Sequence, residues 1–163
     1  MRVFGIDPGL TVTGYGIVES RRGRIHYVDG GFIKTRASEP MEQRLLSIHR
    51  GLAEAFTQHT VDAVAIEAIF RHKSSESAIR LGQARGVALL AAAEAGYEVQ
   101  SYNTMTVKRS VGAHGRADKV AVGKMVEVLL GELPKGPADV TDALAIAITH
   151  VGHARSFKMR AAQ

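Results

Sequence analysis

Four acidic residues are placed where they could hold a metal ion. Asp7 and Glu67 each end a short apolar run that is typical of a buried strand. Asp139 and Asp142 are three residues apart in a segment with helical spacing, so they share one face of a helix. A carboxylate at the end of a buried strand costs folding free energy unless it is paired, solvated or bound to a metal. The four acids are therefore candidate metal ligands.

Hydrolysis of a phosphodiester is the chemistry that such a set of acids supports. Carboxylates that converge without a cation repel one another and raise each other's pKa values. Mg²⁺ takes hard oxygen ligands of this kind, and waters and phosphate oxygens complete its coordination. Two such ions, roughly 3.5–4 Å apart, activate water and stabilise the leaving oxygen. Each acid also has a purely structural interpretation, as a turn former, a solvated strand end or a partner of a helix dipole. The spacing of the acids alone does not decide between metal binding and these structural roles.

The elements that must position these acids follow from hydrophobic periodicity and turn residues. The first three predicted strands are joined by tight turns, so we expect antiparallel neighbours. The fourth follows a helical crossover, which indicates a parallel strand. In chain order we predict strands over residues 2–7, 13–19 and 24–34, a helix over 40–58, a strand over 62–67, a helix over 75–95, a strand over 97–101, and helices over 104–111, 117–130 and 137–151.

The predicted fold class is α/β, with three antiparallel strands followed by parallel ones and with helices covering the sheet. If the first and fourth strands are adjacent and parallel, Asp7 and Glu67 emerge side by side at their carboxyl ends. A last helix that crosses this edge would bring Asp139 and Asp142 to the same place. The acids then come from three separate elements.

Composition indicates an ordinary soluble globular protein. The chain has 163 residues, of which 45% are hydrophobic and 23% charged, and it contains no cysteine. The absence of cysteine excludes a disulfide or thiol site and suits the cytoplasm. The start of the chain does not read as a signal peptide, and its longest apolar run is too short to span a bilayer. We expect one domain over residues 1–153 and a short basic C-terminal tail over 154–163.

Positive charge is concentrated in three stretches of the chain. The formal net charge is +5. Basic residues outnumber acids in residues 71–85, 103–124 and 155–160, so the remainder of the chain is acidic overall. Segregated basic stretches favour a polyanionic partner, and nucleic acid is the usual one. A solvated, solubilising surface is the alternative.

Four sequence blocks in this order resemble the RuvC family of bacterial Holliday-junction resolvases, within the RNase H-like nuclease and integrase group. The blocks are GIDPGLTVTGYG (residues 5–16), AIEAIF (65–70), SAIRLGQARGVA (77–88) and ADVTDALAIAITH (138–150). The resemblance implies an RNase H-like, five-stranded mixed sheet with helices on both faces. It also implies an endodeoxyribonuclease that resolves Holliday junctions by paired symmetric nicks through two-metal hydrolysis, leaving 5′-phosphates, in homologous recombination and DNA repair.

The resemblance also assigns roles to residues. The family's four acidic positions match Asp7, Glu67, Asp139 and Asp142, which would hold two Mg²⁺ ions, or Mn²⁺. Its basic catalytic positions match Lys108 and Lys119, although a plain contact to backbone phosphate is an equal alternative for each lysine. The aromatic residue that the family places against junction bases matches Phe70, for which a core position is the alternative. The expected DNA contacts are Phe70, Arg71, Lys73, Lys108, Arg109, Arg116, Lys119 and Lys124.

Small residues at helical spacing, Ala78, Gly82 and Gly86, form a stripe on the predicted helix over residues 75–95. Glycine inside a helix costs about 1 kcal/mol relative to alanine, so another element should need the room. Either the sheet or a second copy of the chain fills it. The resemblance favours a homodimer on a two-fold symmetric junction, and it implies the RuvA–RuvB branch-migration complex as a partner. His150 and His153 are interpreted as solvated histidines at a helix end, not as metal ligands.

Two other classes of function stay open. Actin-like ATPases and sugar kinases also begin with a GIDxG-type hairpin that holds phosphate, but they need a second large domain. A non-catalytic nucleic-acid-binding module with an RNase H-like fold would explain the basic stretches but not the acids at three element ends. Nucleotide binding would support the first class, and junction binding without metal-dependent cleavage the second.

Overall fold

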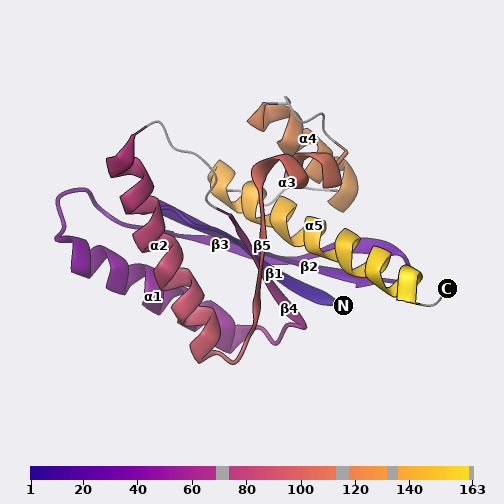
Figure 1. The fold of residues 1–163 in the computed structure, drawn as a ribbon, viewed down its shortest axis with the longest axis horizontal. Coiled ribbons are helices and arrows are strands. Elements are labelled where there is room, and N and C mark those ends of the chain that lie inside the picture. The colour runs from indigo at the N-terminus through magenta and orange to yellow at the C-terminus, as the bar shows by residue number, and fades with distance from the viewer. Residues whose placement is uncertain (69–73, 113–117, 132–135, 162–163) are drawn as a thin grey trace.

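The computed structural model describes residues 1–68, 74–112, 118–131 and 136–161 (Figure 1). The predicted elements are present, and their ends agree within one or two residues except at the end of the last helix. In chain order the elements are β1 (Arg2–Asp7), β2 (Val12–Arg21), β3 (Arg24–Lys34), α1 (Met41–Gln58), β4 (Ala63–Glu67), α2 (Ser75–Glu94), β5 (Val99–Tyr102), α3 (Thr104–Ser110), α4 (Lys119–Leu130) and α5 (Ala138–Ala161).

The strands form one mixed sheet in the order β3-β2-β1-β4-β5. The pairs β1–β2 and β2–β3 are antiparallel, whereas β1–β4 and β4–β5 are parallel. The first and fourth strands are therefore adjacent and parallel, which is the condition on which the convergence of Asp7 and Glu67 depends. Ile6 lies opposite Ile66, so the next residues, Asp7 and Glu67, leave the sheet side by side.

Helices cover both faces of the sheet (Figure 1). Because successive side chains of a strand point to opposite faces, β1 contributes to two cores. Phe4 and Ile6 pack under α1 and α2, whereas Val3 packs under α5, with α3 and α4 alongside. In the described part of the chain, none of the helices is long and apolar enough to cross a membrane.

Glycines in β1 and β2 allow α5 to lie directly on the sheet. A Cβ atom built on Gly5 would lie 2.0 Å from the carbonyl oxygen of Ala143, and one built on Gly14 would lie 2.2 Å from the carbonyl oxygen of Asp139. No side chain fits at either distance. The backbone of α5 therefore passes over the carboxyl end of β1, which places Asp139 and Asp142 beside Asp7.

The last helix is longer than predicted. The expected end at Val151 is wrong, because α5 continues to Ala161 and has no break at residue 153. The role of the basic tail stays a prediction. The helix end predicted at His150 and His153 is wrong for the same reason, but His153 is exposed, as expected for a solvated histidine, whereas His150 is half-buried. The Tyr102 hydroxyl lies 2.9 Å from Nδ1 of His150, and the Tyr102 ring packs edge-on against both histidines. Burial, and then the neighbouring His153, lower the pKa of His150.

Candidate active site

Asp7 is the most perturbed carboxyl group at the edge where β1 and β4 end. Burial is the largest cause that raises its pKa well above the ordinary value. The negative charges of Glu67, Asp142 and, least, Asp139 raise the pKa further, while the Lys119 ammonium lowers it. The other three acids are thus close enough to Asp7 to interact with it electrostatically. Negative charge at Asp7 is only partly compensated by the protein itself.

Two of the other acids are held by side chains from helices that follow the sheet. The Thr104 hydroxyl, at the start of α3, donates to Oε1 of Glu67 at 2.6 Å. Nζ of Lys119, at the start of α4, donates to Oδ2 of Asp142 at 2.6 Å, and this bond raises the pKa of Lys119. Arg85 of α2 contacts the same strand end, because its Nε atom donates to the backbone carbonyl of Glu67 at 3.1 Å.

These side chains surround one cavity of about 180 Å³. Its polar lining consists of acids, lysines and one threonine, and its apolar wall comes from α3, α4 and α5. The lining residues are Asp7, Glu67, Thr104, Val107, Lys108, Lys119, Val122, Asp142, Ala145 and Ile146. Three of the four predicted acids and both predicted catalytic lysines therefore meet in one place, whereas Asp139 does not line this cavity.

The donor set of this cavity fits a hard divalent cation. The acidic side chains offer carboxylate oxygens, and the raised pKa of Asp7 marks a site where added positive charge would be favourable. Among the described residues, however, no three acidic or histidine side chains are gathered tightly enough to enclose one ion. Thr104 and Lys119 instead hold Glu67 and Asp142 individually through hydrogen bonds. Binding of a cation would draw them together.

The other predicted DNA contacts are distributed along the helices beside the cavity. Arg109 is exposed near the end of α3, and Lys124 is exposed in the middle of α4. The remaining predicted contacts lie outside the described residues; these are Phe70, Arg71, Lys73 and Arg116.

Sequence reasoning missed Thr104 as a site residue. The signal was available in part: Thr104 follows the fifth strand directly, at the first position of a helix that Asn103 caps by accepting a hydrogen bond from the Thr106 amide. A hydroxyl at that position lies at the same sheet edge as Glu67, since Glu67 pairs with Tyr102 in β5. What the sequence did not contain was the register of β4 and β5.

The predicted dimer stripe lies on the outer side of α2. Ala78 and Gly82 are half-buried, whereas Gly86 is exposed and a Cβ atom built on it meets nothing within 4 Å. Two large apolar side chains are exposed on the same helix, Ile79 at 62% and Leu90 at 52%. Gly86 lies between them along the helix, so the outward surface of α2 is apolar with a gap in the middle.

Comparison with known proteins identifies close relatives of this chain. A family model described as crossover junction endodeoxyribonuclease RuvC matches residues 3–150. A crossover junction endodeoxyribonuclease RuvC from Dichelobacter nodosus is 47% identical over 152 residues, which covers 93% of this chain and 86% of the relative. The corresponding protein of Caldicellulosiruptor saccharolyticus is 44% identical over 154 residues, covering 93% of this chain and 92% of the relative.

Solved structures agree with these sequence matches. The structure of T. thermophilus RuvC in complex with Holliday junction substrate superimposes with a TM-score of 0.89 at 39% identity, covering 96% of each chain. The yeast mitochondrial Holliday junction resolvase Ydc2 superimposes with a TM-score of 0.63 at 13% identity, covering 97% of this chain and 83% of the other, and so supports the fold alone. The predicted fold class, an RNase H-like mixed sheet with helices on both faces, is confirmed.

Proposed function

The chain belongs to the RuvC family of crossover junction endodeoxyribonucleases, and on that premise we propose that the cavity around Asp7, Glu67 and Asp142 is its active site. The protein is a hydrolase that resolves Holliday junctions in DNA recombination and repair. One observation carries the assignment of the site: acids from β1, β4 and α5 meet a lysine from α4 in a single cavity. Membership of this family argues against both alternatives, the actin-like ATPase and the non-catalytic module.

We assign the metal site to Asp7, Glu67, Asp139 and Asp142, with two Mg²⁺ ions as the cofactor and Mn²⁺ as the alternative. When bound, such ions activate the attacking water and offset charge on the reacting phosphate. Asp7 is the residue whose charge is least compensated by the protein, which makes it the central ligand in this proposal. Thr104 orients the Glu67 carboxylate through its hydrogen bond.

The lysines of the cavity act on the phosphate. Lys119 holds Asp142 in the free protein, and its side chain is 73% exposed, so it is accessible to a phosphate oxygen. A positive group in this position meets the negative charge that develops during attack. Lys108 lines the same cavity from α3 and is assigned the same function. The apolar wall formed by Val107, Val122 and Ile146 limits the access of bulk water.

A direct assay tests the proposed function. End-labelled four-way junction, linear duplex and RNA–DNA hybrid are incubated with the protein, with and without Mg²⁺. We expect paired, symmetric nicks in the junction alone, only in the presence of the cation, and products that ligase can rejoin. Equal cutting of the linear duplex would indicate a general nuclease, and binding of the junction without cutting would indicate a non-catalytic module.

Lys119→Ala is expected to lower the cleavage rate more than the affinity for the junction. Loss of a group that stabilises developing charge costs on the order of a hundredfold in rate. The measurements are the single-turnover rate at saturating protein and the dissociation constant as a function of salt. Lys124→Ala, five residues further along α4, serves as the control. If Lys119 were only a positioning contact, the rate would be unchanged and the salt slope would fall by about 0.9.

Resolution of a junction by two symmetric cuts requires two active sites, and we propose that a homodimer supplies them. The exposed apolar surface of α2, with Ile79 and Leu90 on either side of Gly86, supports this assignment. Gly86 would allow close approach of two copies of the helix at their two-fold axis. We further propose that the dimer acts in the cytoplasm with the RuvA–RuvB branch-migration complex.

Gly86→Leu is expected to shift the protein towards monomer and to uncouple the two nicks. An added side chain would hold the paired helices apart, and overpacking costs about 1–3 kcal/mol. Light scattering gives the mass, and a supercoiled cruciform plasmid distinguishes linear product from nicked circles. Gly152→Leu, a change on α5 where a Cβ atom also meets nothing within 4 Å, is the control and should give linear product like the parent. A monomeric parent at working concentration would contradict the proposal.

A further inference from the structure

A basic hairpin lies at the end of the sheet opposite the active site. The strands β2 and β3 are joined by the two-residue turn Arg22-Gly23, with Arg21 and Arg24 as the last and first strand residues. The side chains of Arg21, Arg22, Arg24 and His26 line one depression, and all four residues are exposed. The proposed catalytic mechanism uses none of them.

The turn carries an arginine in an unfavourable conformation. Arg22 has a φ angle of 46°, and among the described residues it is the one non-glycine residue with a positive φ. A two-residue hairpin turn of this kind favours asparagine, aspartate or glycine at that position. An arginine there exposes a positive charge at the tip of the hairpin at some cost in stability. Such an outlier supports a functional role for the side chain.

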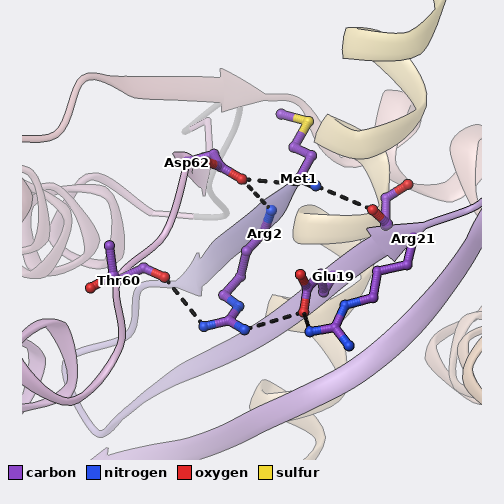
Figure 2. A network of polar contacts seen from close by, with 7 residues as sticks. Met1, Arg2, Glu19, Arg21, Thr60 and Asp62 are labelled. Atoms are coloured by element: carbon purple, nitrogen blue, oxygen red, sulfur yellow. Dashed lines mark hydrogen bonds and ion pairs between the residues drawn. The ribbon is translucent and has the colours of Figure 1, made fainter.

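The carboxylate of Glu19 pairs with Arg21 of the hairpin and also with Arg2 (Figure 2). Glu19 is shared, because its Oε2 atom accepts from Arg21 at 2.7 Å and from Arg2 at 3.2 Å. In the part of the chain that the structure describes, the side chains of Arg22 and Arg24 form no ion pair and no hydrogen bond. Both guanidinium groups are thus available to an anion, and a guanidinium matches phosphate well.

Helix α4 connects this hairpin with the active site. Its first residue, Lys119, binds Asp142, and its last residues, Leu129 and Leu130, border a depression together with Arg24. In β2, Gly14 lies opposite Asp7, and the strand continues for seven residues to Arg21. At about 3.3 Å per residue, the hairpin is roughly 23 Å from the level of Asp7. A DNA duplex covers that distance in about seven base pairs.

We propose that the β2–β3 hairpin binds the phosphate backbone of one duplex arm of the junction, about seven base pairs from the cut. This inference rests on the proposed function, since the arm must start at the active site. Arg22 and Arg24 make the contacts, and they position the arm without reading its sequence. The exposed middle of α4, with Lys124, lies along the path between the two sites.

The test combines a protein variant with a change in the DNA. Arg22→Asn with Arg24→Gln removes both charges, and asparagine tolerates the positive φ of the turn. Binding is measured without Mg²⁺, by fluorescence anisotropy, on a junction with arms of about 20 base pairs over a range of salt concentrations. We expect affinity to fall on the order of tenfold at about 0.1 M salt, and the salt slope to fall by about 1.8, which corresponds to two phosphate contacts.

Neutral methylphosphonate linkages locate the contact on the arm. Placed about seven base pairs from the cut, they should weaken binding of the parent but not of the double variant; placed about fifteen base pairs away, they should affect neither. Arg50→Gln, which removes an exposed arginine from α1, controls for net charge when it is compared with Arg24→Gln.

If the double variant and the methylphosphonate linkages about seven base pairs from the cut weakened binding additively, the hairpin proposal would be overturned. An unchanged salt slope with a lowered melting temperature would also overturn it, because Arg24 would then only stabilise the C-terminal end of α4. Neither result would affect the active-site assignment, which the cleavage assay on the parent tests separately.

Discussion

Asp7→Asn is expected to abolish junction cleavage while leaving junction binding intact. The substitution is nearly isosteric, but it removes the charge of the proposed central ligand. Loss of several kcal/mol of transition-state stabilisation lowers the rate a thousandfold or more, at about 1.36 kcal/mol per factor of ten. The lysines and arginines that contact phosphate are unchanged, so affinity should persist. The measurements are the single-turnover rate in Mg²⁺ and the dissociation constant in Ca²⁺, which should support binding but not hydrolysis.

The fold of the Asp7→Asn variant should not be impaired. Burial and three neighbouring carboxylates disfavour the charged form of Asp7, so an amide is no less stable there in the absence of metal. Thermal unfolding of the metal-free variant would establish this. Asp118→Asn is the matched control: it removes an acid beside Lys119, and asparagine caps α4 as well as aspartate does. An Asp7→Asn variant that cuts within tenfold of the parent would disprove the role of Asp7.

Gly5→Ala is expected to destabilise the protein by about 3 kcal/mol or more, although it adds one methyl group. The new Cβ atom would lie 2.0 Å from the carbonyl oxygen of Ala143 and 2.9 Å from the amide nitrogen of Ala147, both in the backbone of α5. The helix would have to move off the sheet, which opens the core beneath it. A loss of this size lowers the melting temperature by roughly 6–12 °C, which calorimetry would detect.

Gly152→Ala provides the matched control on α5. Its Cβ atom meets nothing within 4 Å, so the same chemical change should stabilise the helix, by up to about 1 kcal/mol. Gly5→Ala should also reduce cleavage, because displacement of α5 moves Asp139 and Asp142 away from Asp7. A Gly5→Ala variant as stable as the parent would show that α5 does not lie against β1.

The sequence determined the elements and the identity of the acids. Strand and helix periods, and the turns between them, are local properties of the chain, so β1, β3 and α1 were predicted within a residue. The crossover through α1 indicated that β4 is a parallel strand, and its pairing with β1 in the structure places Asp7 beside Glu67. The end of α5 was predicted wrongly: Gly152 follows Val151 directly and glycine is common at helix ends, but the helix continues through it to Ala161.

Contacts between distant segments were decided by the tertiary structure. The sequence shows a glycine at residue 5, but only the packed structure shows that the backbone of α5 occupies the space of its missing side chain. The hydrogen bond from Thr104 to Glu67 depends on the register of β4 and β5, and the ion pair from Lys119 to Asp142 depends on how α4 docks on α5. Local periodicity specifies which face of an element is buried, whereas register and docking follow from the packing of the whole core. Most residues of the site could therefore be identified from the sequence, whereas their arrangement depends on the tertiary structure.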